Sequence, residues 1–225
     1  MHSFGLVSEG ITDEAVIANI LAGYFDANDV DLNPLQPLRD ATDRSRTIGS
    51  PGWTEVIGYV KSSKLEAAFQ FFDYIIVQID TDVCELKGYD VPRSANGRAL
   101  EPLELLERVC DKFREWIGET IYDKRKERII LAIAVDSIEC WLMPLYFPSD
   151  KAKRSKTVNC IGTLNEALQK AHGFTISAKE FAYYNRASQG YKRRKALLQA
   201  VPHNPSLKAF IDELDSRKLF AEDEA

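Results

Sequence analysis

Hydrophobic residues occur along this chain in two patterns, short continuous runs and longer segments with helical spacing. Three apolar runs lie at residues 4–7, 75–79 and 128–135, and the last two include many β-branched residues. Such runs suit strands that are buried on both faces of a parallel sheet. A fourth run, at residues 31–38, contains Pro34 and Pro37, so we expect it to form a strand at the periphery of the sheet.

Segments with helical spacing separate these runs, at residues 12–24, 53–72 and 103–117, and a further helix is expected after Asp136. Strand and helix therefore alternate through the first part of the chain. That order favours a parallel sheet with helices on both faces. The sequence predicts an α/β fold, with a four-stranded, mainly parallel sheet flanked by helices.

The apolar pattern changes beyond Pro148. Shorter helical patterns occur there, at residues 164–171, 178–184 and 193–201. We therefore predict an α/β domain over residues 1–148 and a helical C-terminal subdomain over residues 149–225.

Acidic residues follow the predicted strands at the point where each strand ends. Asp80 and Asp82 close the central run, and Glu9 follows the first strand. The carboxyl ends of parallel strands share one edge of a sheet, and ligands bind at that edge in open α/β folds. Carboxylates there would suit Mg²⁺. The alternative is that Asp80 begins a turn and Asp82 is simply solvated.

Two further acids have both a structural and a functional interpretation. Thr12 is a plausible N-cap that places Asp13 in the first turn of a helix, where negative charge is stabilised. Asp136 and Glu139 have the spacing of a capping box, which accounts for both without a metal. A glutamate at a helix start beside a strand end also lies within reach of the acidic site. Both interpretations stay open.

Composition and charge limit the class of protein. The chain has 225 residues, 45% of them hydrophobic and 28% charged, which is typical of a globular protein. Its formal net charge of -5 argues against nucleic-acid binding through bulk positive charge, but not against a local basic groove.

Two clusters of basic residues in the C-terminal part are candidates for such a groove. Charge runs are usually solvated helix faces, yet beside an acidic site they would suit a phosphodiester backbone. The candidate nucleic-acid-binding residues are Lys151, Lys153, Arg154, Lys192, Arg193 and Arg194. Lys153 or Lys192 would offset transition-state charge, and Tyr183, Tyr184 and Tyr191 are candidates for stacking on bases. Arg39, Arg44 and Arg46, in a polar loop, are either phosphate contacts or solvated charges.

The remaining features concern compartment and metal chemistry. No apolar run has the length of a membrane span, and the N-terminus lacks the pattern of a signal peptide, so we expect a cytoplasmic protein. The four cysteines are isolated in the sequence and are expected to be reduced, mostly structural thiols. The three histidines are scattered, which suggests neither a zinc site nor a histidine triad. The cysteines are Cys84, Cys110, Cys140 and Cys160.

Three segments together resemble the Toprim domain shared by topoisomerases, primases and OLD-type nucleases. They are EGITDEAVI at 9–17, IDTD at 79–82, and DSIECWLMP at 136–144, the last similar to a helix start in small bacterial Toprim-like proteins. The resemblance covers roughly residues 4–148. Cys84 stands where topoisomerases and primases commonly have a third aspartate, so a nuclease is the simplest family member.

The resemblance implies specific roles for these acids. Asp80 and Asp82 would bind Mg²⁺ or Mn²⁺, and Glu9 would be a metal ligand or the group that transfers a proton. Asp13 falls where OLD-type nucleases carry a second acid, although theirs is a glutamate. With Glu139, four or five carboxylates would be available to hold two ions for phosphodiester hydrolysis.

Three functions follow as hypotheses. The leading one is a divalent-metal-dependent nuclease that hydrolyses DNA or RNA, with a role in phage defence implied by the resemblance. The second is a non-catalytic Toprim-like component of a defence or repair complex that docks an ATPase partner, since this chain has no phosphate-binding Gly-x-x-x-x-Gly-Lys loop. The third is a flavodoxin-like or receiver-like regulatory domain, against which Glu9-Gly10 and the spread of acids over three strands both count.

Overall fold

A four-stranded, all-parallel sheet forms the centre of the protein. The computed structural model describes residues 2–26, 30–39, 47–48, 52–217 and 219. The strands lie in the order β2-β1-β5-β8. Their bounds are Ser3–Val7 for β1, Asp31–Gln36 for β2, Tyr74–Asp80 for β5 and Ile129–Ala134 for β8. The predicted α/β class and parallel sheet are confirmed, and the proline-containing strand β2 lies at the edge as expected.

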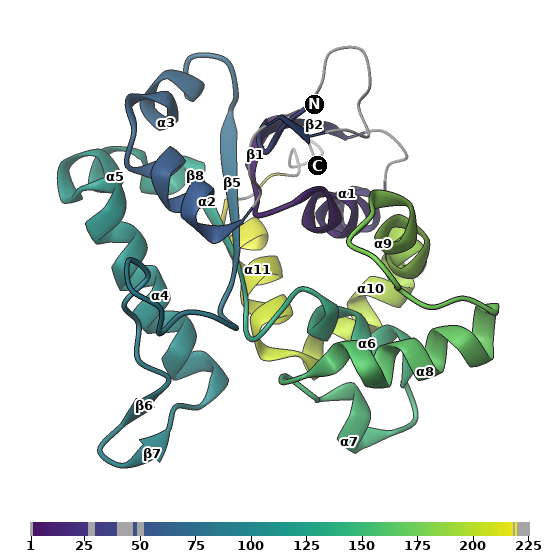
Figure 1. Ribbon diagram of the computed structural model, residues 1–225. Coiled ribbons are helices and arrows are strands. Elements are labelled where there is room, and N and C mark those ends of the chain that lie inside the picture. Colours follow the sequence, from purple (N-terminus) through teal and green to yellow (C-terminus); the bar gives the residue numbers. More distant parts are fainter. Residues whose placement is uncertain (1, 27–29, 40–46, 49–51, 218, 220–225) are drawn as a thin grey trace, which may run out of the picture.

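Helices cover both faces of this sheet (Figure 1). Two hydrophobic clusters form, one on each face, because alternate residues of β5 and β8 point to opposite sides. One face carries α2 (Trp53–Val60), α3 (Ser63–Ala68) and α4 (Pro102–Ile117). The other face carries α1 (Ile11–Phe25), α6 (Glu139–Tyr146), α8 (Cys160–His172), α9 (Phe181–Ser188), α10 (Arg194–Ala200) and α11 (Pro205–Ser216).

Smaller elements connect these helices and strands. They are α5 (Glu119–Arg125), α7 (Lys151–Arg154), the 3₁₀ turns η1 (Lys126–Arg128), η2 (Gln189–Lys192) and η3 (Val201–His203), and two short ribbons. The ribbons pair β3 (Leu38–Arg39) with β4 (Thr47–Ile48) and β6 (Ser94–Ala95) with β7 (Arg98–Ala99). Each helix of the described residues is too short or too polar to cross a lipid bilayer.

The structure differs from the sequence prediction in several local features. The helix expected over residues 53–72 is two helices, because Ser62 caps α3 by accepting a hydrogen bond from Lys64 N. Helix α1 begins after Gly10, so Thr12 is not its N-cap. Helices α5 and α11 have no counterpart in the prediction.

Helices α9 and α10 and the turn η2 between them pack directly on α1 and share its hydrophobic cluster. Gly23 permits the closest approach, since a Cβ atom there would lie 1.9 Å from the carbonyl oxygen of Tyr191. The ring of Tyr191 is fully buried, and its hydroxyl donates a hydrogen bond to the carbonyl of Trp141 in α6. The C-terminal helices are thus fixed against the element that carries Asp13.

This close contact predicts the effect of Gly23→Ala. We expect it to lower the free energy of unfolding by about 3 kcal/mol, because the backbone at Tyr191 must move to admit the methyl group. Gly58→Ala is the matched control, because among the described residues nothing lies within 4 Å of a Cβ atom added to this α2 position. It should be neutral or stabilising by up to about 1 kcal/mol. Urea unfolding of the two variants measures both values, and equal effects would contradict this packing.

Candidate functional site

Acidic side chains from neighbouring strands meet at the carboxyl edge of the sheet. Strands β1 and β5 are adjacent and parallel, so Glu9, just after the end of β1, lies beside Asp80, the last residue of β5. The backbone N–H of Asp80 donates a hydrogen bond of 2.7 Å to Glu9 Oε1. Strand β8 pairs with the other side of β5 and ends just before Asp136. The predicted gathering of these acids at one edge is therefore observed.

Gln78 connects the ends of β1 and β5. Its side chain is fully buried, and its Oε1 accepts a hydrogen bond of 3.2 Å from the backbone N–H of Glu9. Its amide nitrogen donates a hydrogen bond of 2.8 Å to Asp80 Oδ1. One amide therefore positions both strand ends. A polar residue two positions before Asp80, within an otherwise apolar strand, was the sequence signal for this role.

Two acids reach the same site from helix starts. Asp13 lies in the first turn of α1 with 4% of its surface exposed, and Glu139 begins α6 with 8% exposed. Thr12 Oγ1 donates a hydrogen bond to Asp13 Oδ2, and the Tyr184 hydroxyl donates one to Glu139 Oε1. Tyr184 comes from α9, so the C-terminal helices help to position an acid of the site.

Asp136 has a different role from the helix cap that the sequence allowed. Its backbone is in the left-handed region with φ 66°, and both of its carboxylate oxygens have partners. Oδ1 accepts from Arg93 Nη2 at 3.1 Å, and Oδ2 accepts from the backbone N–H of Asn159 at 2.7 Å. The capping-box interpretation is therefore wrong for Asp136. This residue instead connects the loop before α4 to the start of α8.

Burial and mutual repulsion raise the pKa values of the clustered acids. Burial raises the pKa of Glu9 to about 8, and the charge of Asp13 adds to this shift. Burial, with a contribution from Glu139, raises the pKa of Asp13 to about 7. Burial and the charges of Asp13 and Glu9 hold the pKa of Asp80 well above its ordinary value. Burial also raises the pKa of Asp82. Burial is the largest cause of each shift, and for Glu9, Asp13 and Asp80 repulsion among the acids adds to it.

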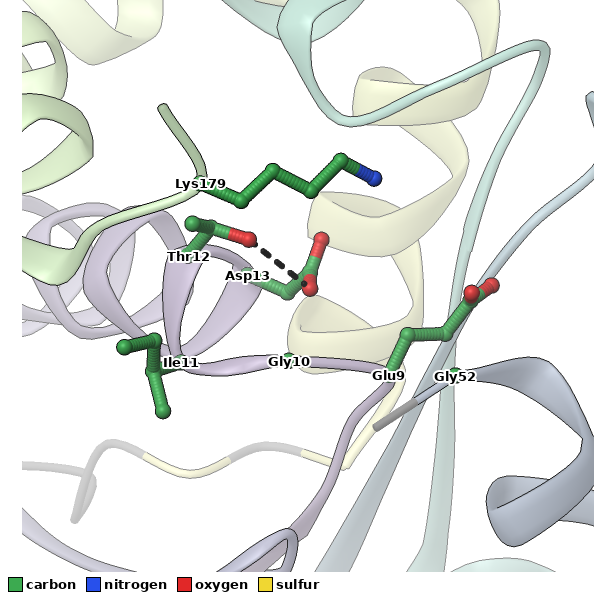
Figure 2. Close-up of a pocket in the computed structure, with 7 residues that line it drawn as sticks. All are labelled: Glu9, Gly10, Ile11, Thr12, Asp13, Gly52 and Lys179. Carbon is green, nitrogen blue, oxygen red and sulfur yellow. Dashed lines mark hydrogen bonds between the residues drawn. The ribbon is translucent and has the colours of Figure 1, made fainter. Parts of the chain in front are cut away.

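Lys179 is the cation that faces these acids. Its side chain extends over Thr12 and Asp13 in Figure 2, from the chain segment before α9. Burial lowers its pKa, but the charges of Glu139, Asp13, Asp80 and Glu9 outweigh that effect and raise it. Among the described residues, Lys179 makes no hydrogen bond or ion pair within 4.0 Å. Its ammonium group is therefore available to an anion that binds between it and the acids.

Two hollows border the acidic residues. One of 210 Å³ lies beside Glu9, Asp13 and Lys179, and is drawn in Figure 2. A second, of 450 Å³, has Asp80, Asp82 and Glu139 on one side. Arg93, Asp136, the start of α8 and Lys179 are also part of the lining of this second hollow.

The carboxylates do not form a preorganised metal-binding arrangement. Within the described residues, no three His, Cys, Asp or Glu side chains are placed so as to hold an ion. One reason is that Glu9 Oε1 and Asp80 Oδ1 already accept hydrogen bonds from the protein. Their second oxygens, Glu9 Oε2 and Asp80 Oδ2, accept none from the residues described. Oxygen donors are therefore present, and closing them around an ion requires side-chain rotation.

The two predicted basic clusters lie apart from each other. Lys151, Lys153 and Arg154 are on α7, where Arg154 donates to the carbonyl of Pro148. The cluster of Lys192, Arg193 and Arg194 lies beside Asp26, at the C-terminal end of α1. Asp13 is at the other end of that helix, about 20 Å away at 1.5 Å per residue.

The prediction that tyrosines stack on bases needs correction for two of the three. Tyr184 and Tyr191 are buried, with 2% and 0% exposed, so neither ring is free to stack on a base. Tyr183 is partly buried and stacks on Phe174. The side chains of Arg39, Arg44 and Arg46 lie outside the described residues.

The cysteine prediction is also wrong for one pair. Cys140 and Cys160, which are 20 residues apart, form a disulfide, whereas Cys84 and Cys110 are free thiols. Their isolation in the sequence gave no sign of this contact, because it depends on how α6 packs against α8.

Comparison with known proteins adds no relative. The chain matches no protein-family model, no curated protein and no solved structure. The chemistry of the site therefore rests on the residues themselves.

The raised pKa values predict how stability depends on pH in the absence of metal. Unfolding returns Glu9 and Asp13 to ordinary values of 4.5 and 3.8, so between about pH 4.5 and pH 8 the folded state binds more protons than the unfolded state. Stability should therefore fall as pH rises through this window. We expect the Tm in EDTA to drop on the order of 5 °C from pH 5 to pH 8.

Differential scanning calorimetry of wild type and Asp13→Asn tests this expectation. The variant removes one of the repelling charges, so its Tm should change less over the same pH range. A Tm that rises from pH 5 to pH 8 in wild type, or an equal drop in both proteins, would refute the electrostatic account.

Proposed function

We propose that this protein is a divalent-metal-dependent nuclease of the Toprim type. The observation that carries this proposal is the gathering of five carboxylates at one sheet edge, opposite an ammonium group that makes no hydrogen bond or ion pair with the residues described. The carboxylates belong to Glu9, Asp13, Asp80, Asp82 and Glu139, and the ammonium to Lys179. Phosphodiester hydrolysis requires charge of both signs in one place, to hold cations and to bind the anionic substrate.

The donor chemistry of the site fits Mg²⁺ or Mn²⁺. Hard cations prefer carboxylate oxygens, and a bound cation would offset the burial and the mutual repulsion that raise the pKa values of Glu9 and Asp13. Asp80, Asp82 and Glu9 would hold the ion, with Asp13 and Glu139 beside them. A cation bound there would acidify a coordinated water and neutralise phosphoryl oxygens.

The chain's own groups would bind the substrate and move a proton. Glu9 would either hold the ion or accept a proton from an attacking water, since its Oε2 accepts no hydrogen bond from the described residues. Lys179 and Arg93 line the hollow beside the acids and would contact phosphate oxygens. Lys179 takes the place that the sequence suggested for Lys153 or Lys192.

The second candidate is a non-catalytic Toprim-like component that docks an ATPase partner in a defence or repair complex. One observation favours it, namely that the described acids do not already form a metal-binding arrangement. In that case the acids would serve stability or partner recognition, and the isolated protein would be inert.

Metal binding and cleavage by Asp80→Asn distinguish these proposals. In wild type we expect Mn²⁺ binding by calorimetry and Mn²⁺-dependent cleavage of labelled DNA or RNA. Loss of the carboxylate charge should lower cleavage at least about 100-fold and weaken Mn²⁺ binding. Asp111→Asn, an exposed residue of α4, is the matched control and should behave as wild type. Wild type that neither binds Mn²⁺ nor cleaves would favour the docking function instead.

Lys179→Met tests the anion-binding half of the site. Removal of the ammonium should lower cleavage about 100-fold, because phosphate loses a charged donor. Mn²⁺ affinity should stay unchanged or increase, since a repelling cation is removed. Lys170→Met, exposed on α8, is the control. Unchanged cleavage, or loss of Mn²⁺ binding in Lys179→Met, would exclude this role.

A further inference from the structure

The Cys140–Cys160 disulfide joins the starts of two helices that border the acidic site. Cys140 is the second residue of α6 and Cys160 is the first residue of α8. Both are buried, with 0% and 1% of their surfaces exposed. The bond closes the chain segment that contains α7. It is therefore the covalent tie between the two helices on this side of the site.

Each half-cystine directly follows a residue that faces the acids. Glu139 precedes Cys140, and its carboxylate is one of the clustered acids. Asn159 precedes Cys160, and its backbone N–H donates the 2.7 Å hydrogen bond to Asp136 Oδ2. Cys160 and Asn159 also line the 450 Å³ hollow, together with Glu139. A change at the disulfide is thus transmitted through one peptide unit on each side.

Within residues 147–158, which follow α6, the side-chain hydrogen bonds are local. Arg154 donates to the carbonyl of Pro148, and Ser155 donates to that of Lys151. These bonds shape α7 and do not attach it to the sheet. The bond from Asn159 to Asp136 does connect the segment to the sheet edge, and it lies next to the disulfide. The start of α8 is therefore held at the site mainly by features at residues 159 and 160, together with the packing of Leu164 and Leu168.

We propose that this disulfide is a redox-responsive tie that controls the acidic site. In the oxidised form it holds the Asn159 amide against Asp136 and keeps the wall of the hollow in place. Reduction separates the two sulfurs from about 2 Å to van der Waals contact near 4 Å. A displacement on the order of 1 Å at such a site is enough to reduce a catalytic rate about 100-fold. The effect on cleavage rests on the proposed nuclease function, whereas the effect on the Asn159 amide does not.

The reductant is a dithiol. Because Cys160 is only 1% exposed, the attack requires a local opening at the start of α8. One thiolate of the dithiol then attacks the sulfur of Cys160, and the sulfur–sulfur bond breaks. Cys140 leaves as a thiolate and takes up a proton. The second thiol of the reductant then resolves the mixed disulfide, so two electrons and two protons pass to the protein and the reductant is released as a disulfide. Reoxidation reverses the same exchange.

The test compares oxidised wild type with wild type reduced by dithiothreitol and desalted anaerobically. Intact mass should differ by the two hydrogens of an opened disulfide. Mn²⁺-dependent cleavage should fall at least tenfold on reduction and return on reoxidation. Hydrogen exchange at the Asn159 amide should accelerate at least tenfold. The Cys140→Ser/Cys160→Ser variant should match the reduced protein in both measurements and no longer respond to dithiothreitol.

Cys110→Ala is the matched control, because it removes a free thiol of α4 and keeps the disulfide. It should respond to dithiothreitol as wild type does. Failure of the disulfide to form under oxidising conditions would overturn the proposal. So would equal cleavage and equal Asn159 exchange in the two redox forms, which would leave the bond a purely structural one.

Absence of cleavage in oxidised wild type would mean that the proposed nuclease function fails. Hydrogen exchange at the Asn159 amide in the two redox forms would then test the redox proposal by itself. Faster exchange at Asn159 on reduction would still support the tie. Unchanged exchange would overturn it.

Discussion

Carboxylates buried at one edge of the sheet repel one another, and the contacts around that edge are arranged to hold them together. Parallel pairing of β1, β5 and β8 brings their carboxyl ends together, and each end is followed by or contains an acid. The protein offsets part of the cost with fixed donors. Gln78 donates a hydrogen bond to Asp80, and the backbone N–H of Asp80 donates one to Glu9. The Tyr184 hydroxyl donates one to Glu139. Because the pKa values of Glu9 and Asp13 stay raised, these donors do not neutralise the site, and it remains suited to bind a cation.

The N-terminal and C-terminal parts of the chain are both needed to build this site. The sheet and α1 provide the acids, whereas Lys179, Tyr184 and the Asn159 amide come from segments beyond Pro148. Close packing of Tyr191 over Gly23 fixes the two parts relative to each other. Without the segments beyond Pro148, the acids would lack Lys179. The C-terminal helices are therefore best understood as one wall of the site.

The sequence predicted the features that depend on local pattern. Short apolar runs identified β1, β5 and β8, and acids at strand ends located the edge where they meet. It did not reveal features that depend on packing between distant segments. Lys179 falls within the helical pattern at residues 178–184, but α9 begins only at Phe181, and nothing in that pattern indicates that this lysine faces the acids. The Cys140–Cys160 contact follows from how α6 meets α8. Asp136 shows the same limit, because its spacing to Glu139 fits a local cap, while the folded chain gives its oxygens to Arg93 and Asn159.

The arrangement of cations around the acids favours an anionic substrate over a purely structural charge network. In a purely structural network we expect each cation to pair directly with a carboxylate. Arg93 does pair in this way with Asp136, at 3.1 Å. Lys179 instead lies over the acids with no partner within 4.0 Å among the described residues, beside a hollow of 450 Å³. The space between the ammonium and the carboxylates is therefore where a metal-bound phosphate would complete the charge balance of the site.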